Sequence, residues 1–407
     1  MANKLTICGD LSASGTIYGT LNQAVSGNVN SGTGTANTWA GCNAFKSVQS
    51  GATYNTGLGY EALCSLTTGD DNTGIGAEAL STTTTGNTNN AFGRRALYSN
   101  TTGSANMAFG HYAGYLNTTG LYNHVFGYQG LCANTTGCFN VGMGYGVLKA
   151  NTTGNCNVAV GPYALDANTT GASNVAVGLN ALGANTTASY NTALGYHSLN
   201  ANTTGTKNVA TGSNSLDTNT TGSANTASGY EALGSNTTAS YNTATGSYAL
   251  YANTTGGFND AFGARSLEAN TTGQYNTASG YYAAQCGTTA QQNVAIGSFA
   301  MRFNTTGNYN TAVGISALRN SNHGNAKDNV AIGHSAFILA QQVHVIQLLE
   351  VLLYILTQQV IVIVLSAGPP YAQTQPGLGR LHLVMQLYSR LQQVNKIMLL
   401  VVIQEQL

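Results

Sequence analysis

The chain has few charged residues, few prolines and a single tryptophan. Of its 407 residues only 6% are Asp, Glu, Lys or Arg, and the 13 basic and 13 acidic residues give a formal net charge of zero. Ordinary soluble domains carry about 25% charged residues. Without net charge or basic clusters, the chain lacks the electrostatic surface of a nucleic-acid binder. Because 43% of the residues are hydrophobic, it also differs from disordered polyelectrolytes.

The cysteines are odd in number and scattered, and no C-x-x-C pair occurs. We interpret them as small residues that fill repeat positions, and not as metal ligands or disulfide partners. They are Cys8, Cys42, Cys64, Cys132, Cys138, Cys156 and Cys286. The first residues, MANKLTICGDLSASG, lack a basic segment followed by an apolar run, so we expect no secretory signal and synthesis in a cytoplasm.

A 17-residue period dominates the sequence, with the unit N-x-A-x-G-x-x-A-L-x-x-N-T-T-G-x-x. Its core glycine recurs at Gly59, Gly76, Gly93, Gly110, Gly127, Gly144, Gly161, Gly178, Gly195, Gly212, Gly229, Gly246, Gly263, Gly280, Gly297 and Gly314. An asparagine precedes each glycine by four residues, at Asn55, Asn72, Asn89, Asn106, Asn123, Asn140, Asn157, Asn174, Asn191, Asn208, Asn225, Asn242, Asn259, Asn276, Asn293 and Asn310. Irregular outer copies lie at Asn37 to Gly41 and at Asn329 to Gly333.

Within each unit, small residues alternate with bulkier ones, as in the N-V-A-V-G of Asn174 to Gly178. This period of two predicts a strand with one face of Asn, Ala and Gly and one of Thr, Val, Ile, Phe or Leu. We expect both faces to be covered. A second short strand is predicted at the Ala-Leu pairs, such as Ala164-Leu165 and Ala249-Leu250. The N-T-T-G that follows predicts a tight corner, because Asn and Gly tolerate left-handed backbone angles.

One 17-residue unit cannot bury its own apolar side, but stacked units can, since Leu then lies on Leu and Asn on Asn. Asparagine side chains stacked in register can also hydrogen-bond along the ladder. The predicted fold is therefore all-β, a repetitive β-solenoid or β-roll fibre of about eighteen 17-residue repeats over residues 37–337. Residues 1–36 are expected to form a β lead-in. At about 4.8 Å per turn the rod would be roughly 85 Å long.

Residues 338–407 change composition to Leu, Val, Ile and Gln but keep the period. The glutamines that remain 17 residues apart are Gln341, Gln358, Gln375 and Gln392. The codons AAC-ACA-ACA-GGT for N-T-T-G, read one nucleotide late, give ACA-CAA-CAG-GT, which encodes the T-Q-Q-V of Thr357 to Val360. We hypothesise a frameshift between about His334 and Ile338, which the coding DNA tests, because an alternative frame must then encode N-T-T-G units.

We assign this out-of-frame tail no function and expect it to be helix or coil. The competing interpretation is a membrane span over Val343 to Ser366, which is long and apolar enough. Glu350, the glutamines in or beside the stretch and the inherited period disfavour a genuine span.

Residue types capable of catalysis are rare. Glu61 and Glu78 share one repeat position and should lie on adjacent turns, at a spacing that resembles a glycosidase carboxylate pair. The next turn has Arg95 there, which favours a surface charge ladder, since nothing in the unit supplies an apolar wall to raise one pKa. Asp70 and Asp71 lie in a corner, and we interpret them as solvated rather than as a metal site.

The histidines occupy scattered repeat positions without a nearby Cys or carboxylate pattern, so we interpret them as surface residues. Those considered are His111, His124, His197, His323 and His334. The sequence therefore predicts no catalytic residue, no metal ligand and no cofactor, and we expect that the protein is not an enzyme.

Two surface features leave alternatives open. Twelve corners match N-x-T and could accept glycans in a eukaryotic secretory route, although the turn role suffices. They include Asn100, Asn117, Asn134, Asn151 and Asn304. Tyrosine, 23 in all, often follows the core glycine, and such an aromatic stripe could stack on sugar rings or pack between chains. Examples are Tyr60, Tyr128, Tyr145, Tyr196 and Tyr230.

The core motif, seen at Asn174 to Gly178, Asn293 to Gly297 and Asn329 to Gly333, resembles the N-x-V-A-I-G repeats in the heads of trimeric autotransporter adhesins. It is still more similar to the N-T-A-V-G-x-x-A-L-x-x-N-T-T-G arrays of phage and other viral tail-fibre proteins. The likeness covers about Asn37 to Phe337, and the lead-in Leu5 to Gly19 is similar to the short β segments before such arrays. The resemblance implies a homotrimeric β-roll or β-prism fibre, often followed by a self-cleaving chaperone, whose loss here a frameshift would explain.

What the resemblance implies for function is the structural shaft of a virion attachment fibre, made in the host cytoplasm. Its expected partners are other copies of the chain and a host-surface glycan or protein receptor, and no nucleic acid. The alternative within structural proteins is a bacterial surface adhesin of the trimeric autotransporter type. From another class, a tailspike polysaccharide depolymerase would need a groove with paired carboxylates. An ice-binding solenoid is suggested by the aligned threonines of N-T-T-G.

Overall fold

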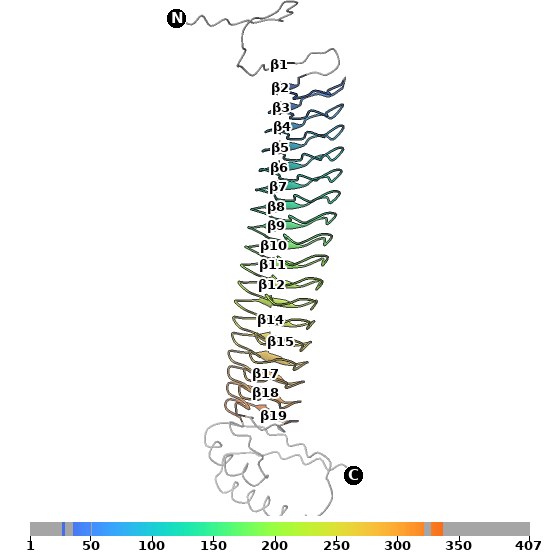
Figure 1. Cartoon of the computed structure of the whole chain (residues 1–407). Coiled ribbons are helices and arrows are strands. Elements are labelled where there is room, and N and C mark those ends of the chain that lie inside the picture. Colours follow the sequence, from blue (N-terminus) through green and yellow to red (C-terminus); the bar gives the residue numbers. More distant parts are fainter. Residues whose placement is uncertain (1–26, 29–35, 50, 321–326, 337–407) are drawn as a thin grey trace, which may run out of the picture.

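The computed structural model describes residues 27–28, 36–49, 51–320 and 327–336. They form a long rod of stacked coils, in which β2 to β19 follow one another along a common axis (Figure 1). The elements in this part of the chain are all strands, and their parallel pairing confirms an all-β solenoid of 17-residue repeats.

Each coil contributes one three-residue strand. The strands are β2 (Thr38–Ala40), β3 (Thr56–Leu58), β4 (Thr73–Ile75), β5 (Asn90–Phe92), β6 (Met107–Phe109), β7 (His124–Phe126), β8 (Val141–Met143), β9 (Val158–Val160), β10 (Val175–Val177), β11 (Thr192–Leu194), β12 (Val209–Thr211), β13 (Thr226–Ser228), β14 (Thr243–Thr245), β15 (Asp260–Phe262), β16 (Thr277–Ser279), β17 (Val294–Ile296), β18 (Thr311–Val313) and β19 (Val330–Ile332). Before them, the two-residue β1 (Gly27–Asn28) pairs antiparallel with β2.

The strands make one 19-stranded sheet that is parallel from β2 onward. The register joins equivalent residues of neighbouring coils, so that Ala176 lies opposite Ala159 on one side and Ala193 on the other. The irregular outer copies join the same stack, with an offset of 18 residues between β2 and β3 and of 19 residues between β18 and β19. The sheet therefore absorbs one or two extra residues per coil without a change of strand register.

The core is a narrow column of alanine and leucine. The strand presents only small side chains inward, and the Ala-Leu pair of the same coil packs against them; Ala176, Ala181 and Leu182 are fully buried. Full burial of one leucine contributes about 1.5–3 kcal/mol. Since a single coil offers one such leucine, stability has to accumulate through the stack.

The predicted second strand at the Ala-Leu pairs is wrong, because these residues form turns. Leu165 and Leu250 have left-handed φ angles of 52° and 51°, which strands do not use. In a strand, consecutive side chains point to opposite faces, yet Ala164 and Leu165 are both buried. The turn brings both into the core, while coil-to-coil bonding continues from Leu165 N to Ala181 O (3.1 Å).

Within the described part of the single chain, one of the two strand faces expected to be covered is left open. The outward side chains stay accessible, with Val177 38%, Ile296 42% and Ile332 57% exposed. The physical reason is that a solenoid coil encloses one interior. The small face of the strand lines that interior, and the bulkier face points away from it.

Several sequence predictions lie outside the described residues. They concern the tail 338–407 with its frameshift and the apolar stretch Val343 to Ser366, most of the lead-in 1–36, Cys8 and His323. Within the residues that the structure describes, no helix has the length and apolarity needed to cross a membrane.

Candidate functional site

The asparagines that precede the core glycines form a buried column. Asn140 Nδ2 donates to Asn123 Oδ1 (3.0 Å) and to Gly154 O (2.8 Å), while its Oδ1 accepts from Asn157 N (3.0 Å). The pattern recurs with small variations from Asn55 to Asn310, whose side chains are at most 3% exposed. Each amide thus ties its own coil to the coil before it and the coil after it.

A second asparagine column runs through the N-T-T-G corners, which the sequence analysis treated only as turns. Asn151 Nδ2 donates to Asn134 Oδ1 (2.9 Å) and to Gly154 O (3.1 Å). Gly154 O therefore accepts from both columns. The signal that could have revealed this ladder is the 17-residue recurrence of the corner asparagine itself, since a buried amide needs partners for more than one of its groups.

Burial of the corner asparagines bears on glycosylation. Asn100, Asn134 and Asn151 are 0% exposed, Asn117 is 1% and Asn304 is 2% exposed. Their Nδ2 atoms donate inside the rod, so the folded chain does not present them as glycan acceptors. Their role in the tight N-T-T-G corners, predicted from the sequence, is enough to explain why asparagine recurs there.

The two corner threonines differ in exposure. The first hydroxyl bonds between coils, as from Thr169 Oγ1 to Thr186 O (3.0 Å), whereas Thr170 is exposed. The second threonine of the corner is therefore the one whose side chain faces solvent. Stacked corners present these threonines as a single row along the rod, and not as the two-dimensional array of hydroxyls that a flat ice-binding face would have.

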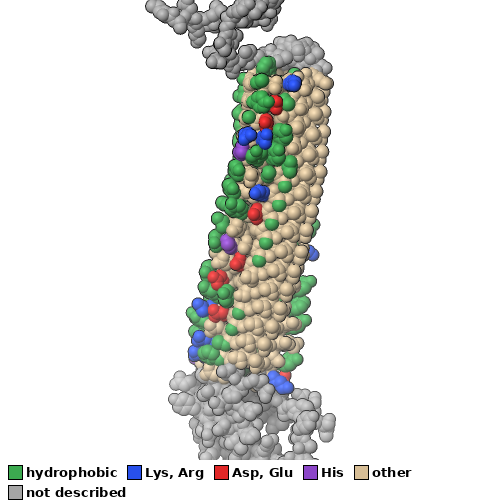
Figure 2. Space-filling view, viewed as in Figure 1, with side chains coloured by type: hydrophobic (Ala, Val, Ile, Leu, Met, Phe, Trp, Pro, Cys, Tyr) green, Lys and Arg blue, Asp and Glu red, His purple; other side chains and the backbone are tan. Residues whose placement is uncertain are grey.

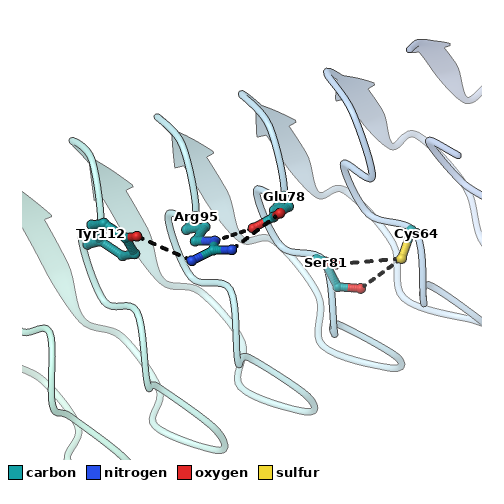
Figure 3. Close-up of polar contacts among 5 residues, drawn as sticks. All are labelled: Cys64, Glu78, Ser81, Arg95 and Tyr112. Carbon is teal, nitrogen blue, oxygen red and sulfur yellow. Dashed lines mark hydrogen bonds and ion pairs between the residues drawn. The ribbon is translucent and has the colours of Figure 1, made fainter. Parts of the chain in front are cut away.

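The carboxylates that the sequence placed at one repeat position lie in one column. Glu78 forms an ion pair with Arg95 of the next coil, and Arg95 in turn donates to Tyr112 Oη (3.2 Å), as Figure 3 shows. The hydrogen bond from Arg95 holds the pKa of Glu78 below its usual range. The pair Glu61 and Glu78 thus has one carboxylate neutralised by an arginine, and Glu78 is not set up as a proton donor.

Asp70 is partly exposed, as expected, but its carboxylate also makes hydrogen bonds that the sequence did not suggest. Its Oδ1 accepts from Thr53 N (2.7 Å) and from Thr53 Oγ1 (2.9 Å), so the carboxylate joins two coils, while Asp71 is exposed. These bonds form because stacking places the corner carboxylate of one coil beside the main-chain and hydroxyl donors of the coil before it. No cluster of three or more His, Cys, Asp or Glu side chains suited to a metal occurs in the described ranges.

The histidines and cysteines lie at separate positions along the rod. His111 stacks on Tyr128 with ring centroids 5.6 Å apart, and His197 pairs with Asn180 (3.2 Å). The cysteines from Cys42 onward carry free thiols. Cys64 Sγ lies 3.5 Å from Ser81 Oγ of the next coil (Figure 3).

Aromatic side chains form two surface columns. The tyrosines after the core glycine are 41–51% exposed, and Tyr128 stacks on Tyr145 with centroids 5.3 Å apart. A second column, missed in the sequence, precedes the ladder asparagines and includes the stack of Tyr241, Phe258 and Tyr275 at 5.0 Å spacings. Rings stacked in this way cover one another's faces, so an added sugar would reach only edges and end rings.

The columns are not distributed evenly around the rod. Figure 2 shows charged and hydrophobic side chains gathered in a stripe along one side, next to a surface made mostly of other polar side chains and backbone. On the face in view, this stripe carries most of the charged side chains, and it is the candidate functional surface.

Asp217 gives a prediction of pH-dependent stability. Burial raises the pKa of Asp217, and its Oδ1 has no hydrogen-bond partner among the described residues. An acid whose pKa is higher in the folded state binds protons preferentially when folded, so the folded state loses stability as the pH rises from the unfolded pKa through the folded one. Asp217→Asn is therefore expected to raise stability at pH 7 by less than about 1 kcal/mol, since solvent screens a partly exposed group.

Thermal unfolding measured at pH 7 and at about pH 3, where an ordinary Asp is protonated, tests this expectation. The gain should disappear at the lower pH. Glu78→Gln serves as the control, because the pKa of Glu78 is lowered and its loss should reduce stability at pH 7. An Asp217→Asn melting curve that is unchanged or shifted downward at pH 7 would contradict the prediction.

Comparison of the sequence with protein-family models and with curated proteins gives no match. Function must therefore be inferred from the residues and geometry of the chain itself.

Proposed function

We propose that the protein is the structural shaft of a virion attachment fibre of the phage tail-fibre type, which holds a receptor-binding tip away from the particle. The observation that carries this proposal is the unbroken stack from β2 to β19, in which each strand pairs in register with the next along one axis (Figure 1). Each coil contacts only its neighbours, so length is set by repeat number. The likeness of the 17-residue unit to tail-fibre arrays supports the same role.

We further propose that the fibre is a homotrimer. The outward strand residues line one face of the rod, on which Val177, Ile296 and Ile332 are more than one third exposed. The face is apolar except at β12, β13, β14 and β16, where Thr or Ser takes the equivalent position. Extended apolar surfaces of this kind are usually interaction surfaces. Three copies that turn these faces toward one another would bury them, as the resemblance implies.

The mass of the purified chain in solution tests the trimer. Light scattering is expected to give three times the 41.9 kDa of one chain. The double variant Val177→Glu/Ile296→Glu should lower the mass toward one chain, because it buries charges in the apolar face. Thr170→Glu, on an exposed corner, is the matched control and should leave the mass unchanged. A wild-type chain that is monomeric would contradict the trimer.

The role as a fibre is tested by electron microscopy. Gold-labelled antibody against residues 51–320 should mark thin appendages on particles released from cells that express the gene. Labelling confined to the bacterial envelope would instead favour the adhesin alternative. Absence of label from particle appendages, with label on the expressed protein as a positive control, would contradict the proposal.

The two remaining alternatives have less support from the geometry. Among the described residues, the carboxylates on adjacent coils that prompted the depolymerase hypothesis include Glu78, which is paired with Arg95. Ice binding is weakened because the first threonine of the corner uses its hydroxyl between coils.

A further inference from the structure

Near the last described coils, two arginines lie against the same two rings. The Cζ atom of Arg302 is 5.4 Å from the ring centroid of Phe299 and 4.9 Å from that of Phe303. The Cζ atom of Arg319 is 5.3 Å and 5.9 Å from the same centroids. These arginines are equivalent residues of successive coils. Two positive charges therefore converge on one small surface, which we name the arginine patch (Phe299, Arg302, Phe303 and Arg319).

No carboxylate neutralises the arginine patch among the described residues, where the ion pairs are Arg95 with Glu78 and Arg265 with Glu268. Arg302 donates Nε to the neutral amide oxygen of Gln285 (2.9 Å). Gln285 donates to Glu268 (2.6 Å), so that carboxylate is occupied by Arg265 and Gln285. Arg319 Nε is buried and has no hydrogen-bond partner within the described ranges.

Arg95 provides the internal comparison. It lies in a different column, two residues after its core glycine where Arg302 is five residues after its own, and it also faces aromatic rings, with Cζ 5.7 Å from Tyr98 and 5.9 Å from Tyr112. Its guanidinium, however, pairs with Glu78 of the preceding coil. The repeat can thus supply a carboxylate partner one coil away, and at Arg302 and Arg319 it does not.

An anionic ligand fits this arrangement. Arg302 Nε is used by Gln285 and Arg319 Nε is buried, so the terminal Nη1 and Nη2 groups are the N–H edges left for bidentate bonds to carboxylates. Like charges on adjacent coils repel, and an anion that bridges them removes the repulsion. Beside the patch, Tyr281 is 47% exposed and meets the edge of Phe299 (centroids 5.7 Å, planes at 79°), which leaves an apolar ring surface beside the charges.

We propose that the arginine patch binds the carboxylate groups of an acidic polysaccharide, one acidic sugar at each guanidinium, with the sugar backbone against Tyr281. A polymer of uronic acids carries one carboxylate on every sugar, so it offers a carboxylate to each of the two arginines. The patch would be a glycan contact on the shaft in addition to the receptor-binding tip, and in that sense the inference rests on the proposed function.

Binding of fluorescent polygalacturonate to the purified full chain tests the proposal by anisotropy. The wild-type chain should bind, with affinity that falls as salt is added. Arg302→Gln/Arg319→Gln should weaken binding at least about tenfold, the loss expected for two charge-assisted contacts. Arg302→Lys/Arg319→Lys keeps the charge without the planar fork and should give an intermediate loss. Arg95→Gln removes an ion-paired arginine and should change Kd less than about twofold.

Neutral dextran should not bind, and dextran sulfate separates carboxylate recognition from general anion binding. The proposal is overturned if the wild-type chain does not bind polygalacturonate, or if Arg302→Gln/Arg319→Gln and Arg302→Lys/Arg319→Lys both bind it as tightly as wild type. It is also overturned if Arg95→Gln weakens binding as much as Arg302→Gln/Arg319→Gln does. Stronger binding of dextran sulfate would identify a sulfated polymer as the ligand and overturn the uronate assignment. Because the assay uses purified chain, its result is independent of whether antibody marks particle appendages.

Discussion

Replacing Asn140 by alanine is expected to destabilise the middle of the rod by about 3 kcal/mol or more. The change removes an amide whose Nδ2 donates to Asn123 Oδ1 and Gly154 O and whose Oδ1 accepts from Asn157 N and Nδ2. Each buried group left without a partner costs about 1–3 kcal/mol. The alanine side chain is also smaller, and the space that it leaves is enclosed between coils.

Denaturant unfolding and amide hydrogen exchange of the neighbouring coils measure this effect. In an array the loss should first appear as faster exchange on either side of the altered coil, because each coil is stabilised by its neighbours. Asn155→Ala is the matched control. Asn155 also accepts a main-chain hydrogen bond across coils, from Cys138 N (2.7 Å), but it is exposed and water can replace it. Equal losses of stability for Asn140→Ala and Asn155→Ala would show that burial of the asparagine column contributes little to the stability of the rod.

Gly178→Ala is expected to lower the free energy of unfolding by about 3 kcal/mol or more, although the change adds a methyl group and removes no contact. Gly178 has φ of 136°, a conformation open almost only to glycine, and such strain costs about 1–3 kcal/mol in other residues. An added Cβ would also lie 2.3 Å from Gly195 O of the next coil. Since this neighbour is backbone and not a flexible side chain, the two coils would have to separate.

The corner glycine supplies the control for this substitution. In Gly171→Ala the new Cβ would meet Ala188 O at 2.3 Å, yet alanine already occupies the equivalent position at Ala188, Ala239 and Ala290. Gly171 does not have the left-handed φ of the core glycine. Gly171 is buried and its new Cβ would also lie 2.4 Å from Asn168 Oδ1, but the coils that already hold alanine here show that the corner accommodates it. We therefore expect a smaller loss than for Gly178→Ala. Circular dichroism melts of both variants check the difference, and similar melting temperatures would contradict the role of the core glycine.

Much of the architecture was predictable because the sequence repeats without a slip over its central part. A register shift of one residue would place ladder asparagines against the bulkier strand residues and reverse the faces of every strand. Identical residues at a fixed spacing therefore favour one stacking. That is why the position of the strand in each unit, the asparagine column from Asn55 to Asn310 and the close approach at the core glycines could be anticipated from the sequence.

The arginine patch was less predictable, since its arginines and its phenylalanines take different positions of the repeat unit. Arg302 and Arg319 share one repeat position, but Phe299 and Phe303 approach them only because the turn after the core glycine folds back on itself. The same turn explains the second strand that does not form. A local pattern such as Ala-Leu is compatible with a strand, and the left-handed φ at Leu165 depends on where the coil must close.

By itself the sequence determined the 17-residue period, the all-β class and the identity of the main ladder, because these depend on spacing along the chain. Only the tertiary structure decided that one strand face stays accessible, that the corner asparagines form a second buried ladder, and that two arginines share one pair of rings. These features depend on how each coil closes around its interior. Closure is a property of several turns acting together, and no short segment encodes it alone.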